Sequence, residues 1–435
     1  MPKPKSWQLN LFYLILFLIP CNLAKHFILP SSYVSGILVD YLIPTIYITD
    51  ILIIILLGSE LQQVILRSRQ MSRLVPNLLF FPALLLPLVI FASSPIPALY
   101  KYLKILLLIL FSIWIKQNIN LKKHSTHIIN TLSASVLFQS LLALTQWFKQ
   151  SSVFNYLPFG IQPYNSATPN IDKITWFTGA IKIPPMGTFP HPNVLAGFLA
   201  VILPLILCKG LSLGSELSAV CSPVKKSGRK IVPNLLRILP LFLGLITLFL
   251  TFSLSAWLAF LLIGLPLVLK SHLKIPPKKF IFIYSGLFLI LFSFATSFTF
   301  LAPASSFSRR SQLTNISLKM IKDKPIFGVG LNNFTINMES YGHVTATTRF
   351  LQPVHNIYLL ILSETGLIGF LAFIYLIGSE LQQVHLRLRR TSELVPNLKI
   401  FWIPLLTLLF LGLFDHYPLT IHQGLLLFFI FLPFI

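Results

Sequence analysis

The sharpest candidate for chemistry in this sequence is the pair His355-Asn356, which is followed after nine residues by Gly366 and then Gly369. A neutral imidazole is a suitable general base near neutral pH. We therefore expect His355 to act as a base at the mouth of an apolar helix, with Asn356 beside it contacting the substrate. The two glycines would let another helix approach closely.

A second candidate is the adjacent pair Arg309 and Arg310, in a polar stretch that also contains Arg349. Guanidinium groups bind phosphate and carboxylate through two parallel hydrogen bonds. The pair could therefore hold a pyrophosphate just outside a membrane, and Arg349 could contribute to the same site. The alternative is that these arginines reach toward lipid phosphates without binding a substrate.

A third candidate is the run Gly-Thr-Phe-Pro-His-Pro-Asn at 187–193, where two prolines flank His191 and Asn193 follows. Both polar side chains are candidates for contacting a substrate. The alternative is a rigid helix start, with Pro192 in the first turn and His191 simply hydrated.

The remaining polar motifs favour structural roles. The Gly-x-Gly at 328–330 has no βαβ unit around it, so it predicts a tight turn after a short amphipathic helix over 309–322 rather than a dinucleotide site. Asp50 and Glu364 lie within apolar stretches, where carboxylates usually have partners, and we expect them to tie helices together. The other acidic residues on the predicted outer side are scattered, so we expect no metal site; they are Asp40, Asp172, Asp323, Glu339 and Asp415.

The elements that must position these residues are membrane-spanning helices. The chain has 435 residues, of which 55% are hydrophobic and only 10% charged, and its mean hydropathy is +0.80. A soluble domain carries about 25% charged residues. Continuous apolar runs rich in Leu, Ile and Phe therefore predict an all-α, polytopic membrane protein with about 12 transmembrane helices and two long extracytoplasmic loops.

We interpret the net charge of +23 as a sign of membrane topology, because the basic residues are spread over many short loops between apolar runs. This spread excludes nucleic acid as the expected partner. Of the 34 basic residues, 22 fall in segments that twelve spans would place inside, so both termini are predicted to be cytoplasmic. The predicted spans are 9–24, 42–57, 78–92, 98–115, 128–148, 193–208, 237–251, 254–270, 280–299, 356–377, 399–414 and 420–434.

An internal repeat fits this topology. Residues 58–78 and 378–398 match at 16 of 21 positions, and a degenerate copy runs over 214–235. All three copies fall in loops assigned to the cytoplasm. They are either a duplicated linker without chemistry or a basic strip that touches anionic lipid headgroups.

Four motifs, in this order and all on the outer side, together resemble the O-antigen ligase family, which also includes O-antigen polymerases. They are Gly-Thr-Phe-x-His-Pro-Asn-x-Leu-Ala from 187, Arg-x-x-x-Leu from 309, Asp-x-Pro-x-x-Gly-x-Gly from 323, and His-Asn-x9-Gly-x-x-Gly from 355. The resemblance covers 185–375, within a single polytopic membrane domain over 1–435. The two long outer loops are 149–192 and 300–355. One departure is Leu254, which stands where the family often has an arginine; Arg310 or Arg349 could substitute for it.

This resemblance implies a glycosyltransferase that acts at the outer face of the cytoplasmic membrane in surface polysaccharide biosynthesis. Such an enzyme moves a glycan from an undecaprenyl-pyrophosphate carrier to a hydroxyl of an acceptor glycan, lipid or protein, with no metal or other cofactor. His355 and Arg309 match the family's catalytic histidine and arginine. We expect Arg310, Arg349, His191, Asn193 and Asn356 to bind substrate.

Two rival interpretations remain. A transporter or flippase of lipid-linked sugars would need charged residues lining the spans and often shows inverted repeats. A non-enzymatic scaffold would leave the outer motifs unexplained. Convergence of His355 and Arg309 on one cavity would separate an enzyme from a scaffold.

Overall fold

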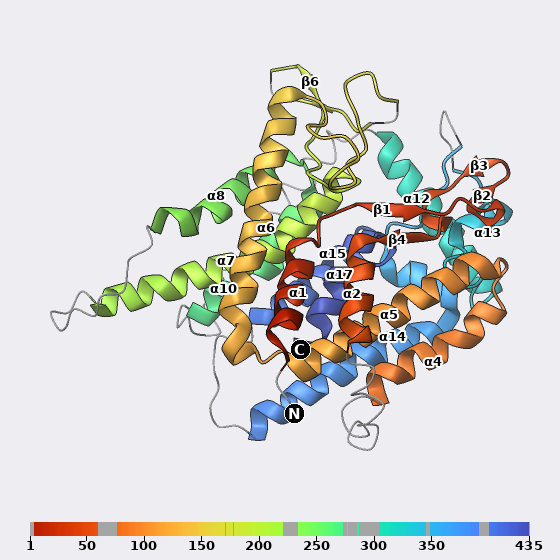
Figure 1. Ribbon diagram of the computed structural model, residues 1–435. Coiled ribbons are helices and arrows are strands. Elements are labelled where there is room, and N and C mark those ends of the chain that lie inside the picture. The colour runs from red at the N-terminus through yellow and green to blue at the C-terminus, as the bar shows by residue number, and fades with distance from the viewer. Residues whose placement is uncertain are drawn as a thin grey trace.

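The computed structural model describes residues 4–59, 76–169, 171–176, 178–220, 234–272, 276, 285–286, 304–344, 349–390 and 400–434. Helices dominate this part of the chain (Figure 1). Two copies of the repeat fall largely outside the described residues, at 60–75 and 221–233, and so does the end of the third copy, from 391. The predicted span 280–299 also lies outside them apart from two positions.

Apolar helices occupy the eleven other predicted spans. They are α1 (Ser6–Phe17), α2 (Ile48–Gly58), α4 (Pro76–Ile90), α5 (Pro95–Asn118), α6 (Leu121–Lys149), α7 (Pro192–Val220), α8 (Asn234–Leu250), α9 (Leu254–Ala259), the π-helix η4 (Phe260–Gly264), α10 (Leu265–His272), α14 (Ile357–Arg390), α15 (Ile403–Leu411), α17 (His422–Phe431) and the 3-10 helix η6 (Leu432–Phe434). Among the described residues, four helices are long and apolar enough to cross a membrane: 95–118, 121–149, 192–210 and 357–382. The shorter ones leave the count of twelve crossings a prediction.

Helix α7 forms the centre of the bundle. It contacts α8, α6, α15 and the π-helix η4, and its stretch from Leu195 to Leu205 is buried almost throughout. A helix that is apolar on every side fits such a position, because no face needs to meet water.

The first two helices are shorter than the predicted spans. Helix α1 ends at Phe17 instead of residue 24, and α2 begins at Ile48 instead of residue 42. The chain between them forms two small antiparallel pairs and two 3-10 turns. Its elements are β1 (Ala24–His26) paired with β4 (Thr45–Tyr47), β2 (Tyr33–Val34) paired with β3 (Ile37–Leu38), η1 (Pro30–Ser32) and η2 (Asp40–Leu42).

We call residues 24–47 the N-terminal cap. Its β2–β3 turn uses Ser35 and Gly36, both with positive φ, the geometry that suits a two-residue hairpin. Val34, Val39 and Leu42 of the cap are buried against Ile336 and Leu351, which come from a distant part of the chain. The cap is therefore packed onto the rest of the molecule.

The other non-spanning segments lie at the same end of the bundle as the cap (Figure 1). They are the loop after α6, with β5 (Ile174–Thr175) and β6 (Ile181–Lys182), and the helices α12 (Ala304–Asp323), α13 (Phe334–Tyr341) and α16 (Tyr417–Thr420). The amphipathic helix predicted over 309–322 is thus confirmed, with α12 extending beyond both predicted ends.

Helix α12 is held against α14 and α13 by a small core of its own. Leu313, Ile316 and Met320 are buried with residues of both neighbours, and the Ser317 and Ser363 hydroxyls are 2.6 Å apart. Leu313 has no exposed surface, so it fixes the rotation of α12 and hence the direction of the side chains one turn before it.

Helix α14 is interrupted at Gly366, where φ is +60°. The chain at 325–330 lies against this break: the Val329 and Gly330 N–H groups donate to carbonyls of α14, and the Leu367 N–H donates to Pro325 O. A Cβ at Gly366 would lie 2.3 Å from the Ile326 backbone carbon. The glycine therefore admits a loop, not the helix that the sequence led us to expect.

Carboxylates inside the apolar helices are partnered, as predicted. Asp50 pairs with Lys104 of α5, and both Glu364 oxygens accept backbone N–H groups, from Asn332 at 2.9 Å and Phe334 at 3.1 Å. A further buried pair, Lys116–Glu380 at 2.6 Å, joins α5 to α14. These contacts satisfy charges that are costly in an apolar environment.

Candidate functional site

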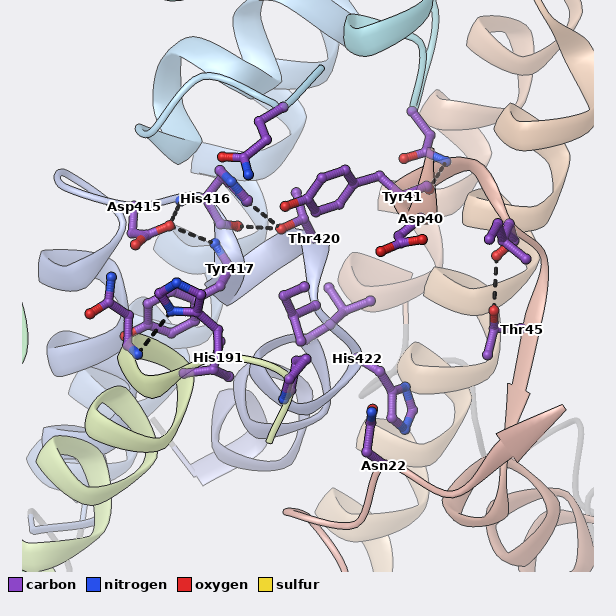
Figure 2. Close-up of a pocket in the computed structure, with 18 of the residues that line it drawn as sticks. Asn22, Asp40, Tyr41, Thr45, His191, Asp415, His416, Tyr417, Thr420 and His422 are labelled. Carbon is purple, nitrogen blue, oxygen red and sulfur yellow. Dashed lines mark hydrogen bonds between the residues drawn. The ribbon is translucent and has the colours of Figure 1, made fainter. Parts of the chain in front are cut away.

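A cavity of about 770 Å³ lies beneath the N-terminal cap. Figure 2 shows its lining, with Asp415, His416 and His191 on one side, Asp40, Tyr41 and Thr45 on the other, and His422 and Asn22 below. Segments from seven distant parts of the sequence contribute: residues 22–47, α5, the 162–194 region, α12, Asn332, 350–355 and 415–425. The cavity therefore exists only in the assembled fold.

His355 lines this cavity just before the first turn of α14. The side chain of Asn356 caps the helix by accepting from the Tyr358 and Leu359 N–H groups, at 2.9 and 3.0 Å. Its amide also donates to Leu413 O at 3.1 Å. The residue after the histidine therefore positions it against the 413–416 segment, and Asn356 itself does not line the cavity.

Asp415 and His416 stand beside His355 and were not singled out in the sequence as site residues. The rings of His355 and His416 meet edge to face with centroids 5.0 Å apart. His416 Nδ1 lies 2.7 Å from the Thr420 hydroxyl, which itself donates to His416 O. That hydroxyl therefore accepts from Nδ1–H, so the lone pair of His416 is on Nε2.

Both imidazoles are neutral at physiological pH. Burial, opposed by Asp415 and reinforced by Arg310, His191 and Arg309, lowers the pKa of His355 to about 4. Burial likewise lowers the pKa of His416 to about 3. His355 Nδ1 is buried without a hydrogen-bond partner among the described residues. A neutral ring with a free nitrogen is able to accept a proton.

Arg309 and Arg310 both line the cavity from α12. Arg309 lies four residues before the buried Leu313, on the same face of the helix, and its guanidinium lies 5.1 Å from the centre of the Phe350 ring. Arg310 is exposed and donates to Phe414 O at 3.0 Å. The spacing Arg-x-x-x-Leu thus has a physical basis, since the leucine anchors the helix that presents the arginine.

His191 and Asn193 line the same cavity at the start of α7. His191 Nε2 is 2.6 Å from the Asp172 carboxylate, and its Nδ1 accepts the Asn193 N–H at 3.1 Å. Asp172 raises the pKa of His191 above its usual 6.5, although burial opposes this. The histidine is therefore an oriented part of the wall rather than a free surface group.

Two buried glutamines of α6 hold the turn that precedes His191. Gln146 accepts the Gly187 N–H at 2.8 Å and donates to Gly187 O at 2.8 Å. Gln139 accepts the Thr188 N–H at 2.9 Å. Gly187 has φ +61°, and a Cβ there would lie 2.4 Å from Gln139 Oε1, so the Gly-Thr pair of the motif is required for this contact.

The N-terminal cap supplies Tyr41 and Asp40 to the opposite wall (Figure 2). The Tyr41 ring meets His416 edge to face at 5.4 Å. The sequence did not single out Tyr41 or Asp40 as site residues. It led us to expect Asp40, Asp172 and Asp415 to be scattered. The structure corrects this expectation, because all three line one cavity.

Two predicted site residues lie elsewhere among the described residues. Arg349 pairs with Glu339 and donates to Ser35 O of the cap, and neither Arg349 nor Asn356 lines the cavity. Leu254 begins α9 and is also absent from the lining. Of the two arginines proposed to substitute at that position, Arg310 is therefore the one in the cavity.

The side chains of His355, Asp415 and His416 could together hold a divalent metal ion. Each offers one ligand atom, and these atoms lie within 4.8 Å of one another. Two neutral imidazoles and a carboxylate suit a transition metal such as zinc. The same groups also suit proton transfer without a metal, and the absence of a metal stays an expectation from the sequence.

Comparison with known proteins gives one match. Residues 239–374 match the family model described as O-antigen ligase. No curated protein matches the chain. The matched segment contains Arg309, His355 and the break of α14. The match supports membership of the O-antigen ligase family, and together with the apolar helices it indicates a multi-pass inner-membrane protein.

Proposed function

We propose that this protein transfers a glycan from an undecaprenyl-pyrophosphate carrier to an acceptor hydroxyl at the outer face of the cytoplasmic membrane. The observation that carries the proposal is that His355 and Arg309, which are 46 residues apart, line one cavity. A scaffold would have no need to bring a neutral base next to a phosphate-binding group. The convergence therefore supports an enzyme.

In this reaction, the acceptor oxygen attacks the anomeric carbon of the glycan. The bond between that carbon and the pyrophosphate oxygen breaks, and its electron pair leaves with the pyrophosphate. The acceptor proton passes to His355. Arg309 and Arg310 stabilise the charge that develops on the leaving group, an interaction that strengthens in the transition state.

The neighbours of His355 suit this proton transfer. When the ring becomes cationic, the Asp415 carboxylate beside it stabilises the new charge, as its influence on the pKa of His355 indicates. The two arginines lower that pKa, so a bound pyrophosphate would offset them and make His355 a stronger base. Binding of the donor would then raise the pKa of His355.

The orientation follows from the charge pattern. Both termini and the basic loops are proposed to be cytoplasmic, which places the cap, α12 and the cavity on the extracytoplasmic side. The loops 149–192 and 300–355 are then the outer segments that carry the site, within a core over 185–375. Membrane lipids surround the bundle, and a hydroxyl on a glycan, lipid or protein is the acceptor.

A flippase would explain charged groups inside the helices, but the pairs Lys104–Asp50 and Lys116–Glu380 are closed ion pairs. Such pairs tie helices together. This observation favours the transferase over the transporter.

The test is the variant His355→Gln, purified in lipid nanodiscs and assayed for glycan transfer from a lipid-linked donor. Glutamine keeps a polar contact but takes up no proton near neutral pH, so turnover should fall roughly 10²–10⁴-fold. His343→Gln is the matched control, because His343 is exposed in the same outer segment and does not line the cavity. Near-normal turnover by His355→Gln would exclude the base.

A further inference from the structure

A second group of cations, contributed by α5, lines the same cavity as the arginines of α12. Lys101 and Lys104 lie three residues apart on one face of α5, a helix long and apolar enough to cross a membrane. Lysines inside such a helix are rare, and each needs a partner or a function. The two side chains differ in this respect.

Lys104 is neutralised within the protein. It pairs with Asp50 of α2 and donates to Thr45 O at 3.2 Å. The rings of Tyr47 and Tyr100 lie 5.0 and 5.6 Å from its ammonium group. The surroundings of Lys104 are therefore those of a structural tie between two helices and the cap.

Lys101 forms no such direct ion pair among the described residues. Its ammonium group donates to Leu419 O at 2.5 Å, but no carboxylate oxygen of the described residues lies within 4.0 Å of it. The nearby Glu364 uses both oxygens to bind the Asn332 and Phe334 N–H groups. The positive charge of Lys101 thus faces a cavity that it helps to line.

The short helix α16 connects the contact of Lys101 with the surroundings of His355 along the chain. His416, which faces His355, is the residue before α16, and Leu419, which binds Lys101, lies one turn further along the chain. In Figure 2, Thr420 lies between His416 and His422. Cationic side chains therefore reach one cavity from two different helices, α5 and α12, and His355 lines the same cavity.

We propose that Lys101 anchors a second anion subsite, which binds a phosphate group of the acceptor. This rests on the proposed function, in which Arg309 and Arg310 hold the pyrophosphate of the donor. A lysine binds phosphate as a point charge with three donors, and Lys101 has donors left beyond its contact to Leu419 O. The acceptor is then itself a phosphate-bearing lipid, with its hydroxyl toward His355 and its phosphate toward Lys101.

Two kinds of acceptor carry such a phosphate: a glycan on a second polyprenyl pyrophosphate, as in polymerisation, and a phosphorylated glycolipid, as in ligation. Both present the same chemistry to Lys101. A comparison of the two acceptors in the transfer assay shows which one is used, and an acceptor lipid without phosphate is the reference for both.

The first experiment counts binding sites for radiolabelled undecaprenyl monophosphate on the purified chain in nanodiscs. We expect two saturable sites per chain, one of which is lost in Lys101→Met and the other in Arg309→Ala. Lys319→Met is the control, because Lys319 lies on α12, binds Tyr341 O and does not line the cavity. A single site, lost in Arg309→Ala and kept in Lys101→Met, would overturn the subsite.

The second experiment measures transfer kinetics. Lys101→Met should raise KM for a phosphate-bearing acceptor about 10- to 100-fold, the effect of losing a charged hydrogen bond, while kcat and the donor KM change less than about threefold. Lys101→Arg should restore most of the affinity. An equal loss with the phosphate-free acceptor, or a rise in the donor KM instead, would contradict the assignment.

The two experiments separate the two proposals. If the wild-type chain binds two phosphates but transfers no glycan, the second subsite stands and the proposed transfer fails. If transfer occurs and Lys101→Met leaves both binding and KM unchanged, the transferase stands and the subsite fails.

Discussion

Arg309 and Arg310 are neighbours in the sequence with different surroundings. Arg309 is half-buried, lies against the Phe350 ring and shares a helix face with Leu313, whereas Arg310 is exposed and already donates to Phe414 O. A charge in a more enclosed position is screened less by solvent. The two arginines should therefore contribute unequally to donor binding.

We predict that Arg309→Ala weakens use of the pyrophosphate donor far more than Arg310→Ala does. Loss of one partner of a buried charged pair costs about 2–5 kcal/mol, and the exposed arginine should cost much less. Donor kcat/KM for the two purified variants provides the comparison. Equal losses of donor kcat/KM in the two variants would show that the spacing Arg-x-x-x-Leu does not distinguish Arg309 from Arg310.

The pH profile follows from the lowered pKa of His355. The base must be neutral, so activity is lost as the pH falls through its pKa, which is about 4 in the free protein. We predict that kcat/KM stays level from neutral pH down to about pH 5. The acid limb of kcat should lie at higher pH, because bound pyrophosphate offsets the arginines. A fall of kcat/KM at a pH near 6.5, the ordinary pKa of histidine, would contradict the lowered pKa of His355.

At the scale of elements, the docking of α12 depends on few buried side chains. Leu313 has no exposed surface and packs against α13 and α14. We predict that Leu313→Ala loosens α12, at a cost of about 2–5 kcal/mol, and lowers donor affinity through displacement of Arg309. Hydrogen exchange of residues 304–323 would detect the loosening. Leu318→Ala on the same helix is the control, since that side chain is half exposed.

The break in α14 gives a second prediction. Gly366→Ala would place a Cβ 2.3 Å from the Ile326 backbone at a φ of +60°, so we expect a marked loss of thermal stability. Gly378→Ala is a matched control in the same helix, because a Cβ there meets nothing within 4 Å and alanine favours helix by about 1 kcal/mol. Melting of the two purified variants in detergent should move in opposite directions.

The long apolar runs were sufficient to place most helices, because hydropathy alone identifies them. The N-terminal cap was missed, since its strands are two or three residues long and depend on contacts with Ile336 and Leu351. Asp415 and His416 were missed as site residues because they fall in the few residues between α15 and α16, with no local motif. Lys101 and Lys104 are charged residues inside the otherwise apolar predicted span 98–115. This departure from the apolar pattern was the signal that could have identified them as site residues.

At the scale of the whole molecule, the sequence predicted that the motifs share one side, and His191, Asn193, Arg309, Arg310 and His355 do line one cavity. It could not predict which side chains meet there. Arg349 is an example, since its pairing with Glu339 and its contact with the cap depend on how two distant loops pack. Pairings between loops are set by tertiary contacts that leave no periodic pattern in the sequence.

The twelve-span topology is the prediction that belongs to this scale. Reporter tags inserted at Arg69, Lys226 and Arg389 should all report the cytoplasm, and tags near Asn170 and Asn337 should report the outside. The reason is the excess of basic residues in the loops assigned inside. Protease protection or cysteine labelling in intact cells provides the measurement. Opposite sides for any two of the first three positions would require a different number of crossings.

The cavity beneath the cap is lined by residues from Asn22 to Leu425, which has a consequence for synthesis. The ribosome delivers His355 sixty residues before Asp415, a delay of about 3–12 s at usual elongation rates. During that interval a nascent chain holds its base and its arginines without the wall that carries Asp415, His416 and the Leu419 carbonyl. The proposed transfer therefore cannot begin until the last helices have been inserted, so translation itself would delay its onset.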